Sequence, residues 1–252
     1  MSEITIRYLG HSSLMIHTDK INFLFDPNFD DKLIKMKRLD KAKFDRELLH
    51  EVQVILISNP HHHRLNLPSF KFLKQAAQLF LPLGLSKIVN TYFHFRVTEL
   101  KEGAQTEVGD TKIIGIKSLH KAFRNFSLIR KNALNYIIKT PTKTIFYCSD
   151  SPYEGSYFFD LGKEYNIDLA ILPIDHVGLD VFAKNRYMTR EQALQAMQDL
   201  GAKKMIPYCF GSFNFAGRKR ESVLSLFKKD IEKASLEDKV VILEPGQTTQ
   251  IT

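Results

Sequence analysis

The sequence lacks the features of secreted, membrane-spanning and disulfide-stabilised proteins. It has only two cysteines, Cys148 and Cys209, among 252 residues, which excludes a disulfide scaffold and favours a reducing compartment. No stretch approaches the roughly 18 consecutive apolar residues that indicate a membrane-spanning helix. The first residues carry no basic segment followed by an apolar run, so we expect no secretory signal. These absences predict a cytoplasmic protein without a transmembrane segment.

Internal repeats, low-complexity tracts and Gly/Ser linkers are also lacking. With 44% hydrophobic and 25% charged residues, the chain can bury a large core. We therefore expect one folded domain over residues 1–252. The formal charge of +8 comes from 36 basic and 28 acidic residues that are interspersed along the chain. This distribution favours anionic substrates only weakly and shows no tail of one sign.

Short β-prone runs and helical stretches alternate along the chain. Hairpins begin each half, and strand–helix–strand units follow them, which predicts two mixed sheets packed face to face with helices outside. The expected strands are residues 4–9, 14–17, 21–25, 52–58, 106–108, 112–118, 135–139, 144–148, 169–174, 205–210 and 240–243. A further buried strand is expected to end in Leu81-Pro82-Leu83-Gly84. The expected helices are residues 44–50, 67–78, 189–200 and 222–233.

Side chains that can bind metal lie at the carboxyl ends of the expected buried strands. His61 and His63 follow residues 52–58, His120 follows residues 112–118, Asp150 follows residues 144–148, and Cys209 lies at the end of residues 205–210. Rigid strands can bring such side chains to one point, so the placement predicts a shared site.

Short motifs at these positions resemble those of a known family. They follow one another in this order: Leu9-Gly10-His11-Ser12-Ser13, Phe25-Asp26-Pro27, Leu56-Ile57-Ser58, Leu67-Pro68-Ser69, Leu81-Pro82-Leu83-Gly84-Leu85, Ser149-Asp150-Ser151, Asp168-Leu169-Ala170-Ile171-Leu172-Pro173-Ile174, Tyr187-Met188, Glu191-Gln192-Ala193 and Phe210-Gly211-Ser212-Phe213. The order resembles the metallo-β-lactamase superfamily, in the branch that contains N-acyl-phosphatidylethanolamine phospholipase D and its bacterial relatives. The resemblance implies an α/β fold, a four-layer αββα sandwich with the site at one edge.

The metal-binding motif departs from that family. The family carries H-x-H-x-D-H where this sequence has Asn59-Pro60-His61-His62-His63-Arg64. By the resemblance, His61 keeps a ligand position, His63 replaces an aspartate, and Asn59 and Arg64 replace histidines with a poor ligand and a permanent cation.

Three further ligand positions lie later in the chain. His120 and Asp150 match the family's residues, and Cys209 replaces its final histidine with another group that can bind zinc. An arginine inside the ligand shell disfavours two closely spaced divalent ions, so we expect at most one tightly bound metal. Zinc is the expected ion, iron and manganese are alternatives, and a metal-free protein is a further alternative.

Two ligand sets remain open for that ion. His63, Asp150 and Cys209 would form a mixed N/O/S site, which the softness of sulfur favours for zinc. His61, His120 and Asp150 would form the family's first metal site. In either case Asp150 would hold the metal and orient a water, which a bound ion can activate.

Two further side chains are candidates for contact with a substrate. Arg64 could pair with an anionic substrate oxygen. Tyr187 stands where the family has a histidine and could donate a hydrogen bond to developing charge. We therefore predict catalytic roles for Asp150, Tyr187 and Arg64.

Each of these residues also has a simpler interpretation. The histidine run could be a polar strand end, and Cys209 could be a buried, inert thiol. His11 and Asp26 fit a purely structural role in turns. His176 could line the pocket or lie on the surface.

The leading hypothesis is a metal-dependent hydrolase acting on a phosphoester or phosphodiester, with a small-molecule or lipid-like anionic substrate. The alternative is a non-catalytic descendant that binds a ligand or partner in the old pocket. A zinc-dependent nuclease fits the basic charge, but such nucleases keep the H-x-H-x-D-H motif, so we expect no nucleic-acid partner.

Overall fold

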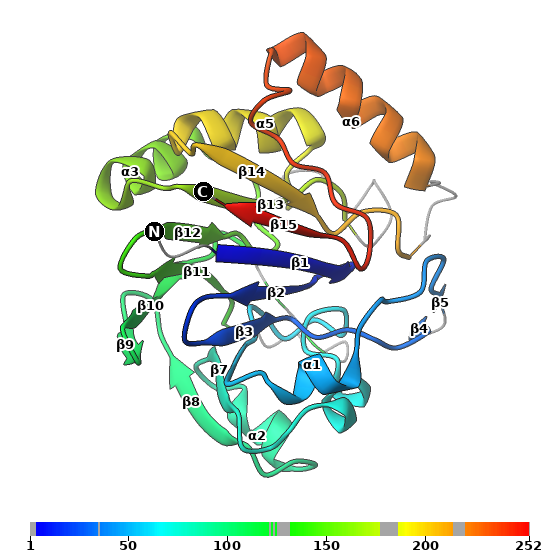
Figure 1. The fold of residues 1–252 in the computed structure, drawn as a ribbon, viewed down its shortest axis with the longest axis vertical. Coiled ribbons are helices and arrows are strands. Elements are labelled where there is room, and N and C mark those ends of the chain that lie inside the picture. The colour runs from blue at the N-terminus through cyan, green and yellow to red at the C-terminus, as the bar shows by residue number, and fades with distance from the viewer. Residues whose placement is uncertain are drawn as a thin grey trace.

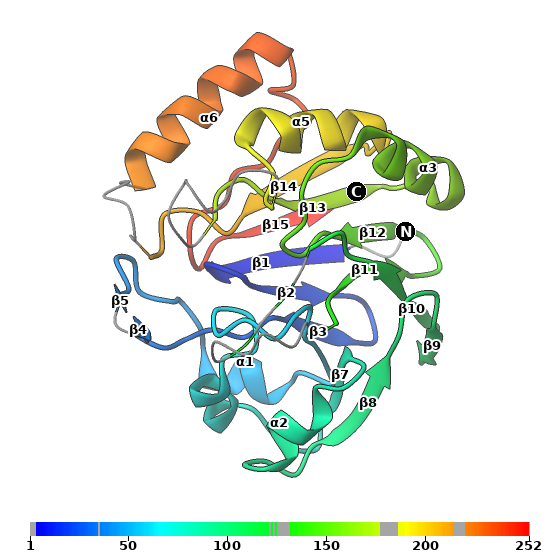
Figure 2. The same cartoon turned by 180° about the vertical axis from the view of Figure 1, so that it is seen from behind.

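The computed structural model describes residues 4–34, 36–120, 122, 124, 132–176, 186–213 and 220–251. Two mixed β-sheets pack face to face, and helices cover the outer face of each (Figures 1 and 2). The layers confirm the predicted αββα sandwich. None of the described helices is long and apolar enough to cross a membrane.

The first sheet is built mainly from the amino-terminal half and has the strand order β15-β1-β2-β3-β6-β7-β8. Its neighbours pair antiparallel from β15 to β3 and parallel from β3 to β8. The strands are β1 (Ile4–Gly10), β2 (Ser13–His17), β3 (Asn22–Phe25), β6 (Val54–Leu56), β7 (Gln78–Pro82), β8 (Arg96–Leu100) and β15 (Thr248–Ile251).

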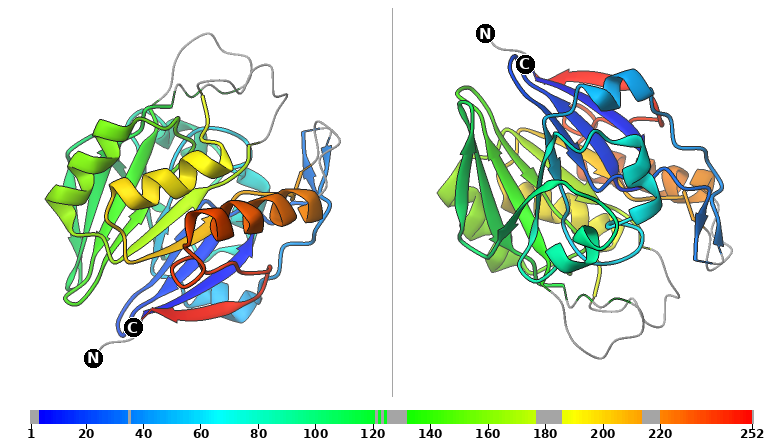
Figure 3. Two further views of the ribbon diagram at one scale, coloured as in Figure 1. Left: turned by 90° about the horizontal axis from the view of Figure 1, so that it is seen from above. Right: turned by 90° about the horizontal axis from the view of Figure 1, so that it is seen from below.

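The second sheet has the order β14-β13-β12-β11-β10-β9, with parallel pairing from β14 to β12 and antiparallel pairing from β12 to β9. Its strands are β9 (Gln105–Val108), β10 (Thr111–Lys117), β11 (Leu134–Lys139), β12 (Thr144–Tyr147), β13 (Leu169–Pro173) and β14 (Lys204–Tyr208). A separate hairpin of β4 (Lys32–Leu33) and β5 (Met36–Lys37) projects from the body (Figure 3).

Alternation along the strands produces three apolar layers. In β13, Leu169 and Ile171 face the core between the sheets, whereas Ala170 and Leu172 face the helices outside. In β6, Val54 and Leu56 face the central core, and Ile55 faces the opposite outer layer. Buried side chains of this size each contribute about 1.5–3 kcal/mol, so the central core holds the sheets in a fixed relation and their ends can form one site.

The helices α3 (Gly155–Tyr165), α5 (Arg190–Asp199) and α6 (Arg220–Ala234) cover the second sheet. Helices α1 (Arg46–His50) and α2 (Ser86–Asn90) and the 3₁₀ helix η1 (Leu67–Phe72) cover the first. A capping box between Thr189 and Gln192 begins α5 where the sequence predicts a helix start.

Two predicted elements differ from the structure. The helix expected over residues 67–78 is limited to η1, and β7 begins at Gln78. The apolar residues Leu67, Phe70 and Leu73 recur every third position, which suits a 3₁₀ helix better than an α-helix. The strand expected over residues 240–243 contributes only one bridge, between Met205 and Val240.

Candidate metal centre

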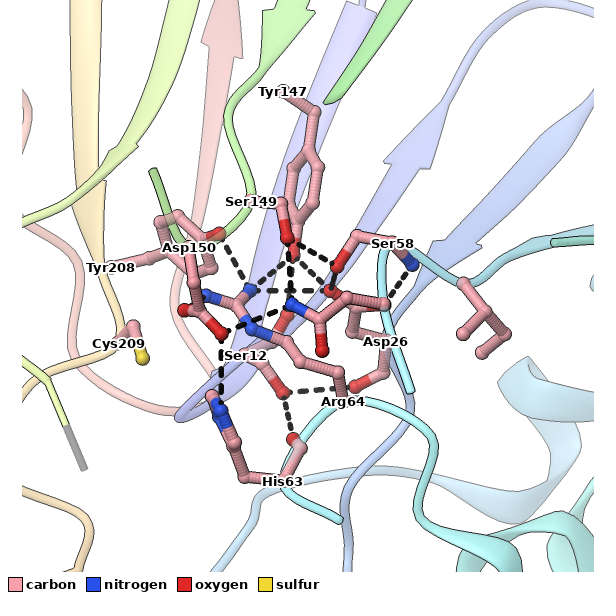
Figure 4. Close-up of polar contacts among 12 residues, drawn as sticks. Ser12, Asp26, Ser58, His63, Arg64, Tyr147, Ser149, Asp150, Tyr208 and Cys209 are labelled. Atoms are coloured by element: carbon pink, nitrogen blue, oxygen red, sulfur yellow. Dashed lines mark hydrogen bonds and ion pairs between the residues drawn. The ribbon is translucent and has the colours of Figure 1, made fainter. Parts of the chain in front are cut away.

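The segment after β6 brings the predicted histidines to the edge where both sheets end. Hydrogen bonds fix this segment on two sides: Arg124 donates to the carbonyls of Pro60 and Leu65, and Ser12 Oγ donates to the His63 carbonyl at 2.8 Å. His61 lies next to His120, which follows β10. His63 and Arg64 contact Asp150 after β12, and Arg64 also contacts Tyr208 at the end of β14 (Figure 4).

His61, His120 and Asp150 form one group of potential metal ligands, with donor atoms that all lie within 4.8 Å of one another. The Nε2 atoms of His61 and His120 are 2.7 Å apart. Burial lowers the pKa of both imidazoles, that of His61 from 6.5 to about 3, so both are neutral at pH 7 and keep lone pairs for a metal. This is the set that the resemblance assigns to the first metal.

Asp150 contacts three other side chains of the candidate metal centre. Its Oδ1 accepts from Arg64 Nη2 at 2.5 Å, and its Oδ2 lies 3.1 Å from His63 Nε2 and 3.0 Å from Asn59 Nδ2. Burial alone would raise the pKa of Asp150, but Arg64 and His63 hold it well below its usual range. The carboxylate is therefore ionised and can act as a ligand.

Arg64 lies inside the protein, with no exposed side-chain surface. Its Nη1 donates to Asp26 Oδ2 at 3.2 Å, Tyr147 Oη at 2.9 Å and Tyr208 Oη at 2.6 Å, and Figure 4 shows the guanidinium among these groups. The predicted contact with a substrate oxygen does not fit this position, because both terminal nitrogens already serve buried partners. Arg64 instead places a fixed positive charge between Asp26 and Asp150.

Asp26 is the second carboxylate that contacts the Arg64 guanidinium. Its carboxylate accepts from the backbone N–H of Ser58 at 2.7 Å, from Ser58 Oγ at 2.6 Å and from Tyr147 Oη at 2.7 Å. Burial raises the pKa of Asp26, and Arg64 and Ser58 oppose that shift. The sequence predicts a structural role for Asp26, and its contacts lie within the protein.

By the resemblance, Asn59 stands where the family has its first histidine. Its Nδ2 donates to Asp150 Oδ2 and to Ser149 Oγ, at 3.0 and 2.9 Å. Its Oδ1 accepts from the backbone N–H of His61 at 2.9 Å. The amide thus positions the carboxylate and the histidine loop.

His11, His63 and Cys209 form a second group of potential ligands, all buried and also within 4.8 Å of one another. His11 Nε2 lies 3.1 Å from His63 Nδ1 and 3.9 Å from Cys209 Sγ. Burial lowers the pKa of His11 and raises that of the Cys209 thiol, so both are uncharged without a metal.

This grouping differs from the predicted set of His63, Asp150 and Cys209. His63 contacts Asp150 as expected, but the third member of the group that contains Cys209 is His11. His11 was expected to have a structural role, bonding backbone groups in the turn that it begins. Its position before Ser12 in the turn after β1, at the same edge as the end of β14, is the signal that could have identified it.

Tyr187 lies beside the first ligand group. Its ring centroid is 5.1 Å from that of His120, and it stacks on His176 at 5.2 Å. Burial raises the pKa of Tyr187, so the phenol stays protonated at neutral pH and remains a hydrogen-bond donor. His176 thus packs on Tyr187 near the centre.

A hollow opens next to His120. Its lining includes His120, Lys101, Lys117, Glu102 and Asn132. Both lysines are exposed to solvent, so they place positive charge at an approach to the first ligand group.

The comparisons with known proteins agree with this architecture. Curated relatives include the UPF0173 metal-dependent hydrolases of Pyrobaculum arsenaticum, 22% identical over 98% of this chain and 99% of the relative, and Methanopyrus kandleri, 21% identical over 96% and 98%. Among solved structures, Igni18, a metallo hydrolase from Ignicoccus hospitalis, is 19% identical with a TM-score of 0.74 and covers 99% of both chains. The isothiocyanate hydrolase from Delia radicum gut bacteria is 14% identical with a TM-score of 0.79, over 97% of this chain and 98% of that one.

A family model described as a beta-lactamase superfamily domain matches residues 21–208. The matched region extends from β3 to β14. It includes all of the first ligand group and His63 of the second, whereas His11 and Cys209 lie outside it. With most of its 252 residues inside that match, this chain belongs to the metallo-β-lactamase superfamily.

Proposed function

We propose that this protein is a metal-dependent hydrolase with one catalytic ion, held by His61, His120 and Asp150. The observation that carries the proposal is the convergence of two neutral imidazoles and one ionised carboxylate within 4.8 Å. Two nitrogens and one oxygen, with an open fourth position, are the ligand set of catalytic zinc sites. A divalent ion bound there supplies Lewis acidity toward a substrate oxygen and toward water.

The residues around the ion would have separate roles. Asp150 would be one ligand of the ion, because a carboxylate offers about four acceptor sites and Arg64, His63 and Asn59 use only three of them. Asn59 fixes the orientation of that carboxylate, and the Tyr187 hydroxyl would donate a hydrogen bond to charge that develops on the substrate. Arg64 acts as a positioning residue, since its terminal nitrogens serve protein partners.

We further propose a phosphoester or phosphodiester as the substrate. The resemblance to the N-acyl-phosphatidylethanolamine phospholipase D branch supports this class, and Lys101 and Lys117 beside His120 suit an anionic group. The second candidate function is ligand binding without catalysis. It is favoured by Arg64, whose permanent charge replaces one of the ligands that catalytic relatives use for their second metal.

One experiment separates these functions. The protein is purified without chelator, its zinc, iron and manganese content is measured, and hydrolysis of chromogenic phosphomonoesters, phosphodiesters and carboxylic esters is assayed with each ion. We expect phosphodiester hydrolysis that His120→Asn abolishes and that Lys87→Ala, on the exposed surface of α2, leaves unchanged. Metal binding without turnover of any substrate would favour the ligand-binding function. Hydrolysis of carboxylic esters alone would overturn the phosphoester assignment.

A further inference from the structure

We propose that His11, His63 and Cys209 form a second metal site, specific for zinc or another ion that binds sulfur. It is separate from the group of His61, His120 and Asp150 and takes no ligand from it. The site goes beyond the proposed function and does not depend on it, because a non-catalytic protein could hold such an ion equally well. With both sites filled, the protein would bind two ions, whereas the sequence predicts at most one.

The spacing of the donor atoms fits a zinc ion. For tetrahedral zinc with Zn–N near 2.05 Å and Zn–S near 2.3 Å, two nitrogens lie about 3.3 Å apart and a nitrogen and a sulfur about 3.6 Å apart. His11 Nε2 lies 3.1 Å from His63 Nδ1 and 3.9 Å from Cys209 Sγ. Shifts of a few tenths of an ångström would therefore bring these two pairs to zinc-binding distances, and all three donor atoms lie within 4.8 Å of one another.

The contacts of His63 direct a lone pair into this site. Its Nε2 lies 3.1 Å from Asp150 Oδ2. An ionised carboxylate only accepts hydrogen bonds, so Nε2 carries the proton and Nδ1 is left with a lone pair toward His11. A histidine whose other nitrogen donates to a carboxylate is the usual arrangement of a metal-bound imidazole.

The backbone holds His11 and Cys209 together. Both have left-handed conformations, with φ of 51° and 59°, and the Cys209 N–H donates to the His11 carbonyl at 3.0 Å. Within the described residues, His11 Nδ1 has no hydrogen-bond partner, so the polar contacts of this ring are with the other two members of the site. Two residues that lie 198 positions apart are thus brought into contact.

The chemistry of the three donors selects the ion. Two imidazoles and one thiolate suit zinc and cobalt better than magnesium or calcium, which prefer oxygen. Binding breaks the S–H bond of Cys209, the sulfur electron pair binds the ion, and that proton passes to the solvent. The proton through which His11 Nε2 contacts the lone pair of His63 Nδ1 moves to His11 Nδ1, so that Nε2 can bind the ion. A fourth position remains for water or an anion.

Cobalt provides a direct test, since a cobalt–thiolate bond gives a charge-transfer band in the near ultraviolet. Metal-free protein is titrated with cobalt(II), and the band and the number of bound ions are recorded. We expect the band in the wild type and in Cys148→Ser, the matched control at the only other cysteine. We expect its loss in Cys209→Ser, with one fewer ion per chain, and at least a tenfold weaker affinity of the band-forming site in His11→Asn.

The variant His120→Asn distinguishes this site from the catalytic one. It should keep the band while losing one ion and the hydrolytic activity. A wild type that binds one ion without the band, while Cys209 stays reactive to a thiol reagent after unfolding, would overturn the second site and leave the proposed function intact. Persistence of the band in Cys209→Ser would also overturn it. Thermal unfolding of each variant verifies that the fold is retained.

Discussion

The Nε2 atoms of His61 and His120 lie 2.7 Å apart, and both rings are largely removed from water. Two protonated imidazoles could not approach so closely without strong repulsion. Burial favours the neutral form of both rings, which is the form that binds a metal.

This neutrality makes the stability of the metal-free protein depend on pH. His11, His61 and His120 all have folded pKa values below the ordinary 6.5, so below pH 6.5 the unfolded chain binds protons that the folded chain does not. Stability is fully present above pH 6.5 and falls as pH decreases, by up to about 1.4 kcal/mol per pH unit for each histidine. Urea unfolding at pH 7.5, 6.5 and 5.5 measures the slope. His61→Asn should reduce the slope of the unfolding free energy against pH by the contribution of about one proton. A slope equal to that of the wild type would contradict the lowered pKa of His61.

The buried Arg64 charge should matter more for stability than a surface arginine does. Arg64→Met leaves Asp26 and Asp150 buried without a cation, and we expect a loss of about 3–5 kcal/mol in the free energy of unfolding. Arg64→Lys keeps the charge but cannot donate to both carboxylates in the same way, so its loss should be smaller. Denaturant unfolding checks both. The control is Arg96→Met on the exposed part of β8, and a loss below about 1 kcal/mol for Arg64→Met would show that the network contributes little.

Tyr187 should affect turnover and not metal binding. Because its pKa is raised, the phenol donates a hydrogen bond throughout the neutral range, and Tyr187→Phe removes only that donor. We expect kcat to fall on the order of 10²-fold, with the metal content unchanged. Tyr153→Phe is the matched control, since its hydroxyl bonds Asp199 away from the centre. Equal kcat values for the two variants would exclude a catalytic hydroxyl at position 187.

The two lysines beside His120 should act on substrate affinity. We expect Lys101→Ala/Lys117→Ala to raise KM for a phosphodiester about tenfold, with kcat little changed, since each exposed charge contact contributes up to about 1 kcal/mol. The difference in KM between this variant and the wild type should shrink in high salt, because exposed charges are screened. An uncharged ester should show no change in KM. A similar rise for that ester would indicate a steric effect instead.

The apolar pattern was sufficient to predict the layers, because strands such as β13 and β6 are continuous apolar runs that are buried on both faces. It failed for β15, where Thr248 to Ile251 are mostly polar. That strand lies at a sheet edge and pairs with β1, and an edge strand needs little apolar character when its backbone bonds supply the pairing. Its partner is at the other end of the chain, which no local pattern indicates.

The candidate metal centre, like the fold, was predictable from the sequence in part. His61, His120 and Asp150 come together as the resemblance implied, because each follows a strand whose end is fixed by the sheets. Neither the position of Arg64 nor the pairing of His11 with Cys209 could be derived in this way. The pairing depends on left-handed backbone angles at His11 and Cys209. The position of Arg64 depends on contacts with groups from both sheets, which sequence spacing does not encode.

A cation carried on a side chain behaves differently from one taken up from solution. The charge that Arg64 places between Asp26 and Asp150 is made during translation, cannot be removed by chelators and cannot be exchanged for a competing ion. Asp26 and Asp150 therefore stay paired whether or not either ligand group holds an ion.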